Sequence, residues 1–193
     1  MQVTLKKITG IWADGWALDK HMIKSTFLGH DEYGHARFDN LRTEVGEATY
    51  QLKYGQQWSA VAPLAQALVE HIVPKLPNIG LIIPMPASKA RERQPVTEVA
   101  REVGRLTSTP VFENLLLKSS TGQSLKDLNT REEKLEAIGD SLSVNDVIAG
   151  DNRWNVLLID DLYHSGASMH AACVALGNYR KIANIYVAAL TWR

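Results

Sequence analysis

The stretch from Val156 to Ser168 constrains the fold more than any other part of the sequence. Its first four residues, Val156 to Ile159, are apolar and partly β-branched, as is typical of a short parallel strand covered on both faces. Asp160 and Asp161 follow at once, and after Ser168 small apolar residues recur at helical spacing. This order predicts a buried strand, a tight loop and a helix.

The loop of this unit is suited to a phosphate group. Backbone N–H groups at the start of a helix, together with the positive end of its dipole, attract anions. Ser165 and Ser168 can donate hydrogen bonds to the same oxygens, and Gly166 lets the backbone approach closely. Asp160 and Asp161 would repel a phosphate at contact, so we expect them to accept hydrogen bonds from sugar hydroxyls. Capping of the following helix is the alternative role for the two acids.

The rest of the chain alternates between strand-like and helix-like segments. Apolar runs and periodicity predict strands over 79–84, 109–112, 142–144 and 185–190, and helices over 42–52, 58–72 and 95–106. Such alternation favours an α/β fold with a parallel sheet and helices on both faces. In such sheets, ligands bind beyond the carboxyl ends of the strands.

The N-terminal segment has a different pattern. Residues 1–40 contain short β-favouring stretches separated by turn formers, which predicts a small antiparallel hairpin or meander. We therefore expect one domain over 1–193, with an N-terminal β hood at 1–40 and an α/β core at 41–193. The aromatic residues of the hood would form either a small second core or a stacking surface for a nucleobase: Trp12, Trp16, Phe27 and Phe38.

Composition narrows the class of protein. With 193 residues, 45% apolar content and a formal net charge of zero, the chain has enough apolar residues for one sizeable core and no global attraction to nucleic acid or anionic membranes. It has no run of eighteen apolar residues and no signal-peptide core. The single cysteine, Cys173, suits a reducing compartment. We expect a cytoplasmic protein that does not bind membranes or bind nucleic acid directly.

Several segments resemble one known family. The Asp160–Ser168 segment resembles the ribose-phosphate motif of the type I phosphoribosyltransferases. Three further segments, in the expected order, resemble the ComF-like group within that family: Tyr50–Gly55, Ile82–Arg93 and Lys118–Leu125. The resemblance covers roughly residues 45–193. Many members of the group carry an N-terminal cysteine cluster for zinc, which a chain with one cysteine cannot form.

This resemblance implies the roles of specific residues. The catalytic residues would be Asp160 and Asp161. The ribose and 5′-phosphate of phosphoribosyl pyrophosphate would be held by Asp160, Asp161, Leu162, Tyr163, His164, Ser165, Gly166, Ala167 and Ser168. The pyrophosphate would be held by Pro84, Met85, Pro86, Ala87, Ser88, Lys89, Arg91 and Arg93. Lys118 and Gln123 would belong to a mobile loop over the site. The cofactor would be magnesium, held mostly by the ligand and water rather than by the protein alone.

Two functions remain open at this point. The first is a phosphoribosyltransferase, in which a nitrogen nucleophile from an unidentified base or amine attacks phosphoribosyl pyrophosphate and pyrophosphate leaves. The second is a non-catalytic ComF-like module that senses nucleotides or binds a partner in DNA uptake. A homodimer is compatible with either function.

Overall fold

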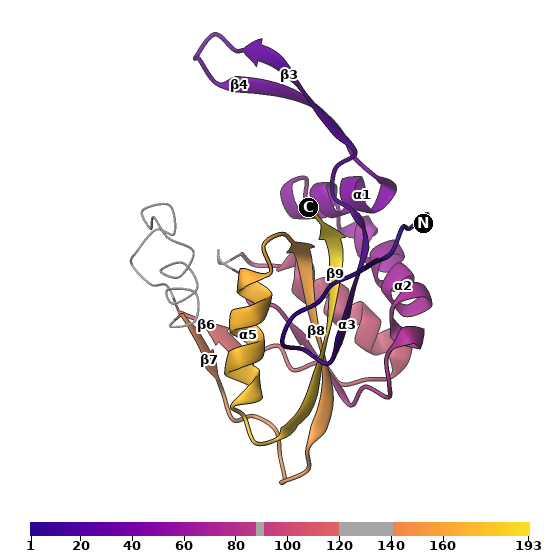
Figure 1. The fold of residues 1–193 in the computed structure, drawn as a ribbon, viewed down its shortest axis with the longest axis vertical. Helices are drawn as coiled ribbons and strands as arrows, with labels where there is room; N and C mark the ends of the chain where they lie inside the picture. The colour runs from indigo at the N-terminus through magenta and orange to yellow at the C-terminus, as the bar shows by residue number, and fades with distance from the viewer. Residues whose placement is uncertain (88–90, 120–140) are drawn as a thin grey trace.

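In the computed structural model, described for residues 1–87, 91–119 and 141–193, one twisted sheet organises the chain. Its strand order is β1-β2-β9-β8-β5, with β2, β9, β8 and β5 parallel and β1 antiparallel at the edge (Figure 1). The bounds are Lys6–Lys7 for β1, Asp14–Lys20 for β2, Leu81–Pro84 for β5, Trp154–Tyr163 for β8 and Ile182–Trp192 for β9. Beyond β5, Val111 forms a parallel bridge to Ile82. The predicted strand at 109–112 is therefore reduced to a single bridge.

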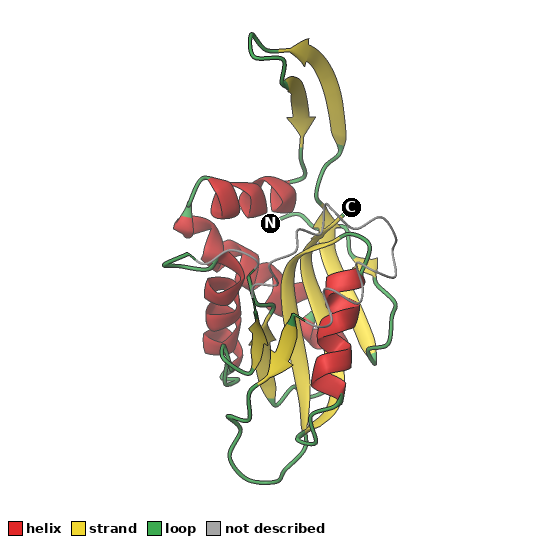
Figure 2. Cartoon of the chain, turned by 90° about the vertical axis from the view of Figure 1, so that its left-hand side faces the viewer, coloured by secondary structure: helices red, strands yellow, loops and turns green. Residues whose placement is uncertain are grey.

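Helices cover both faces of this sheet (Figure 2). One face carries α1 (Glu44–Tyr54), α2 (Val61–His71) and α3 (Pro95–Thr107), with 3-10 turns at Trp58–Ala60 and Val73–Lys75. The other face carries α5 (Ala167–Gly177). A short antiparallel pair, β6 (Leu116–Lys118) and β7 (Leu142–Val144), lies on the α5 side. The predicted α/β fold, with a mostly parallel sheet between helical layers, is confirmed.

Strand β8 shows how the sequence builds these layers. Successive side chains of a strand point to opposite faces. Val156 and Leu158 accordingly pack with the α5 cluster, whereas Leu157 and Ile159 pack with the cluster under α1, α2 and α3. All four side chains are at most 1% exposed, which explains why this strand reads as a continuous apolar run.

The structure corrects two expectations. Strand β8 does not end at Ile159 but continues through both aspartates, because its pairing with β9 extends to Tyr163 and Trp192. The N-terminal segment is only partly a separate antiparallel unit. Strand β2 lies inside the main sheet, parallel to β9, and its Ala17 and Leu18 are fully buried. Both faces of β2 are covered by the core, a property that the turn-rich pattern around it obscured.

The separate antiparallel unit is shorter than expected. It is a hairpin of β3 (Lys24–His30) and β4 (Ala36–Leu41), which stands away from the sheet and helices (Figure 1). The mobile loop expected to contain Lys118 and Gln123 lies mostly outside the described residues. Within the described ranges, no helix is long and apolar enough to cross a membrane.

Candidate active site

A cavity of about 350 Å³ opens beyond the carboxyl ends of β5 and β8, where ligands bind in parallel α/β sheets. Five parts of the fold converge on it: the end of α1, the segment after β5, the start of α3, the β6-β7 pair, and the end of β8 with the start of α5. Its lining residues are Lys53, Tyr54, Met85, Pro86, Ala87, Arg91, Gln94, Pro95, Val96, Lys118, Leu142, Asp160, Asp161 and Ser168. The two predicted catalytic acids therefore lie in one cavity with part of the predicted pyrophosphate loop.

The two adjacent carboxylates approach this cavity from different faces of the sheet. Because side chains alternate along β8, Asp160 follows Leu158 on the face covered by α5, and Asp161 follows Ile159 on the face covered by α1. The Asp161 carboxylate forms an ion pair with the Lys53 ammonium group of α1. The Asp160 carboxylate accepts a hydrogen bond of 2.8 Å from the backbone N–H of Asp161.

The environment of the two acids gives them different electrostatics. Burial, followed by the negative charge of Asp161, raises the pKa of Asp160 from 3.8 to about 7. Burial by itself lowers the pKa of Lys53, but the charge and hydrogen bond of Asp161 outweigh it and the pKa is raised. The site therefore holds one charged pair, Lys53 with Asp161, and one carboxyl group that readily takes up a proton.

The end of β9 forms hydrogen bonds that fix the backbone of the acid pair. The Thr191 hydroxyl donates a hydrogen bond of 2.8 Å to the backbone oxygen of Asp161, and His21 Nδ1 lies 3.2 Å from the same hydroxyl. Burial and the nearby Arg42 guanidinium lower the pKa of His21. This network ties the backbone of Asp161 to the neighbouring strand.

The phosphate-binding loop predicted between β8 and α5 forms a tight turn. Gly166 has a φ of 77° and caps α5, and a side chain there would lie 2.9 Å from the Tyr163 hydroxyl. The backbone N–H of Ala167 points to the Ser165 hydroxyl at 3.4 Å. Ser168, in the first turn of α5, lines the cavity. The exposed His164 is absent from the lining residues.

The predicted pyrophosphate loop divides into two parts. Met85, Pro86, Ala87 and Arg91 line the cavity, and Arg91 also donates a hydrogen bond of 2.8 Å to the backbone oxygen of Lys53. Arg93 lies outside the lining, because its guanidinium contacts Glu98 at 2.7 Å and stacks 4.2 Å from the ring centre of Trp58. Pro84 ends β5. Ser88 and Lys89 fall outside the described residues, as does Gln123 of the predicted mobile loop, whereas Lys118 lines the cavity.

Sequence reasoning missed the contribution of α1. Lys53 and Tyr54 both line the cavity, and Tyr54 is 62% exposed. Their segment, Tyr50–Gly55, resembles the ComF-like group, but the resemblance assigns it no role at the site. Helical periodicity identifies the buried face of α1 through Leu52. It does not show that the next side chain, Lys53, contacts Asp161 in a strand 108 residues later.

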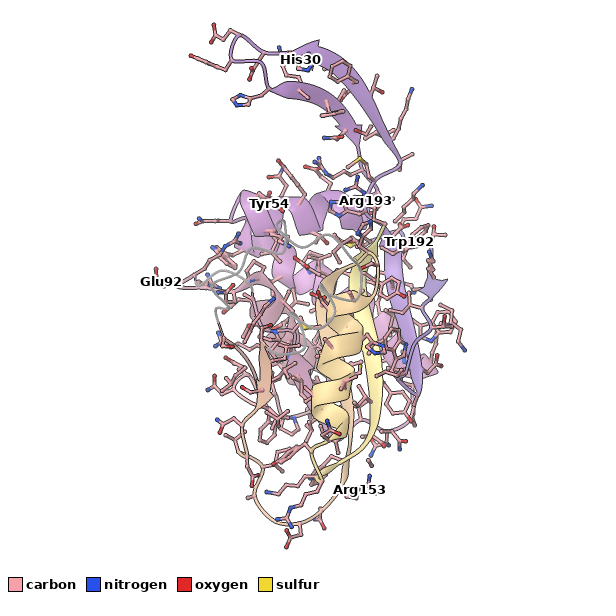
Figure 3. The ribbon with its side chains drawn as sticks, turned by 60° about the vertical axis from the view of Figure 1, so that its left-hand side comes forward. His30, Tyr54, Glu92, Arg153, Trp192 and Arg193 are labelled. Atoms are coloured by element: carbon pink, nitrogen blue, oxygen red, sulfur yellow. The ribbon has the colours of Figure 1, made fainter. Side chains whose placement is uncertain are left out.

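The β3-β4 hairpin does not contribute to this cavity. Its residues are absent from the lining, and His30 on the hairpin lies far from Tyr54 at the end of α1 (Figure 3). Phe27 and Phe38 of the expected hood therefore do not stack over the site of their own chain.

Comparisons with known proteins support the fold. No protein-family model and no curated protein matches the chain. Among solved structures, the chain is similar to glutamine phosphoribosylpyrophosphate amidotransferase from B. subtilis, with 11% identity, a TM-score of 0.51 and coverage of 83% of this chain and 34% of the other. It thus spans about a third of the amidotransferase. Two adenine phosphoribosyltransferases also match. For the one from Thermoanaerobacter pseudethanolicus the identity is 14%, the TM-score is 0.45, and the match covers 89% of this chain and 96% of the other. For the one from Trypanosoma brucei the identity is 14%, the TM-score is 0.46, and the match covers 98% of this chain and 74% of the other.

The amidotransferase match shows that the chain has a phosphoribosyltransferase-type α/β fold. At this level of identity the likeness concerns the fold alone. It does not bear on the narrower resemblance to the ComF-like group.

Proposed function

We propose that the protein is a phosphoribosyltransferase: it binds phosphoribosyl pyrophosphate with magnesium and transfers the phosphoribosyl group to a nitrogen nucleophile, releasing pyrophosphate. One observation carries this proposal. A single cavity at the carboxyl ends of β5 and β8 combines an acid pair, a helix N-terminus and three cationic side chains, Lys53, Arg91 and Lys118. These are the groups that a sugar carrying a monophosphate and a diphosphate requires.

The proposed roles follow from where each group lies. Backbone N–H groups of the Gly166 turn and the hydroxyl of Ser168 hold the 5′-phosphate, aided by the α5 dipole. Asp160 and Asp161 accept hydrogen bonds from the ribose hydroxyls. Arg91 binds the diphosphate, whose negative charge grows as its bond to the sugar breaks. Placing a fixed cation where that charge develops lowers the barrier.

Lys53 adds a step that the sequence did not predict. In the structure its ammonium forms an ion pair with the Asp161 carboxylate. When the ribose hydroxyls donate hydrogen bonds to the Asp161 carboxylate, the Lys53 ammonium, which also lines the cavity, can attract the diphosphate. Lys53 thus exchanges the carboxylate for the diphosphate. Its ammonium keeps an anionic partner, which reduces the free-energy cost of removing these charges from water.

The donor set fits a magnesium ion supplied with the ligand. Two carboxylates line the cavity, and the described residues hold no group of three or more metal-ligating side chains. Magnesium suits such a site, because it is usually held by one or two carboxylates with phosphate oxygens and water. When bound, it would neutralise diphosphate charge, and Asp160 and Asp161 are the residues that would hold it.

Pyrophosphate release tests the proposal. The purified protein is incubated with phosphoribosyl pyrophosphate, magnesium and a panel of purines, pyrimidines and amines, and pyrophosphate is measured by a coupled assay. We expect release with at least one acceptor and its loss in Asp160→Asn and Asp161→Asn. Binding without turnover across the panel would instead favour the non-catalytic module, and absence of binding would reject both functions.

A further inference from the structure

The β3-β4 hairpin exposes several large apolar side chains to water. Phe27 and Phe38 are 53% and 52% exposed, and Leu28 and Leu41 are each 58% exposed. Apart from its base, the hairpin stands clear of the sheet and helices in both views (Figures 1 and 2). A two-stranded hairpin alone is marginally stable, and clustered exposed aromatic residues mark an interaction surface.

The pairing within the hairpin gives each face a distinct character. Phe27 lies opposite Phe38, with ring centres 5.6 Å apart. Arg37 and Asp39 flank Phe38 on the strand and so point to the opposite face. Both are exposed, and neither takes part in an ion pair within the described residues of this chain.

The two free edges of the hairpin differ. Strand β3 has an irregular register between Phe27 and Gly29, and such a bulge disrupts pairing with a further strand. Strand β4 pairs regularly, is short and carries no proline. The edge of β4 is therefore the one suited to accept another strand.

We propose that β4 pairs antiparallel with β4 of a second copy of this chain, about a two-fold axis at Phe38. The sequence of β4 is complementary to itself in this register: Arg37 of each copy lies opposite Asp39 of the other, and Phe38 lies opposite Phe38. Such a reciprocal pattern is what a two-fold interface requires. The result is a four-stranded sheet with a continuous stripe of Phe27, Phe38 and their two counterparts on one face.

Charge reversal tests this pairing sharply. Light scattering at about 50 µM should give twice the chain mass of 21.4 kDa for the wild type. Arg37→Asp and Asp39→Arg each place like charges opposite one another twice, so each should weaken dimerisation at least about tenfold. The double variant restores two opposite-charge pairs and should dimerise again. An equimolar mixture of the two single variants should form a heterodimer, because each supplies the charge that the other lacks.

Engineered disulfides give a second, independent measurement. In the proposed register Ala36 lies opposite Asn40 of the other copy, so Ala36→Cys/Asn40→Cys should form an intermolecular disulfide under mild oxidation. Thr26→Cys on β3 is the matched control, since two such cysteines would be at least about 14 Å apart across three strand spacings. The native Cys173 is buried and should contribute little background.

Specific outcomes would overturn the proposal. A wild type that stays monomeric at this concentration would do so, as would a dimer that both charge reversals leave intact. Crosslinking of Thr26→Cys as fast as Ala36→Cys/Asn40→Cys would indicate a different pairing. The hairpin contributes nothing to the cavity of its own chain, so these results are independent of the outcome of the pyrophosphate assay.

Discussion

Replacing Asp160 by asparagine is expected to stabilise the ligand-free protein while removing its ability to bind phosphoribosyl pyrophosphate. The reason is the cost of ionising this carboxyl group beside Asp161 in a half-buried position. Asparagine has nearly the same shape, and its side-chain oxygen can still accept the 2.8 Å hydrogen bond from the Asp161 backbone N–H. The substitution therefore removes a charge and leaves the local structure in place.

The magnitude follows from the pKa. Folding raises the pKa of Asp160 from 3.8 to about 7. Each pH unit of difference corresponds to about 1.4 kcal/mol, which sets an upper bound of roughly 4 kcal/mol. Water in the open cavity and rearrangement of Lys53 reduce this cost, so we expect a gain of about 1–2 kcal/mol and a rise in Tm of about 3–6 °C at pH 8.

The sign of the pH dependence is a further check. Between about pH 4 and pH 7 the unfolded chain has lost the Asp160 proton, whereas the folded wild type retains it. Wild-type stability therefore falls relative to the variant as the pH rises through this range. The advantage of Asp160→Asn should be small near pH 4 and complete above pH 7.

Thermal and urea unfolding of both proteins between pH 4 and pH 8 would measure this difference. Asp161→Asn is the matched control: it makes the same isosteric change but removes the ion pair with Lys53, so we expect no gain in stability. A variant Asp160→Asn that is no more stable than the wild type at pH 8, or whose advantage does not change with pH, would refute the reasoning.

Four further substitutions separate the roles of neighbouring groups. Lys53→Met should weaken phosphoribosyl pyrophosphate binding about tenfold or more in isothermal titration, because the cation paired with the acid is lost; unchanged affinity would contradict its proposed role. Arg91→Gln should weaken pyrophosphate binding about tenfold. Arg93→Gln should have a smaller effect, because the Arg93 guanidinium is held by the Glu98 carboxylate and the Trp58 ring. Equal losses of affinity would show that both arginines reach the ligand. Gly166→Ala should cost about 1–2 kcal/mol in urea unfolding, given a φ of 77° and the nearby Tyr163 hydroxyl; a neutral result would mean that the turn relaxes freely.

The local order of strand, turn and helix was predictable because it depends on neighbours in the chain. The apolar run before Asp160 and the periodicity after Ser168 are short-range patterns, and a strand and a helix form at these two places. The strand end was misplaced because sheet pairing, not the side-chain pattern, carries β8 on to Tyr163. The position of β2 was missed for the same reason, since its partner β9 lies at the other end of the chain.

The candidate site shows the same division. The sequence placed Asp160, Asp161 and Ser168 in one motif, and the structure places all three around one cavity. It could not distinguish Arg91 from Arg93, because spacing along a loop does not say that Glu98 and Trp58 hold the second guanidinium.

The fold class follows from the sequence alone, because the burial pattern that separates strands from helices is a local property of the chain. The environments of the two acids, in contrast, depend on the tertiary structure. Side-chain alternation along β8 directs the two carboxylates to opposite faces, and the packing of α1 brings Lys53 to only one of them. One carboxylate is thereby charged and paired, while the other has its pKa raised to about 7. That difference arises from contacts between segments more than a hundred residues apart, which no local pattern records.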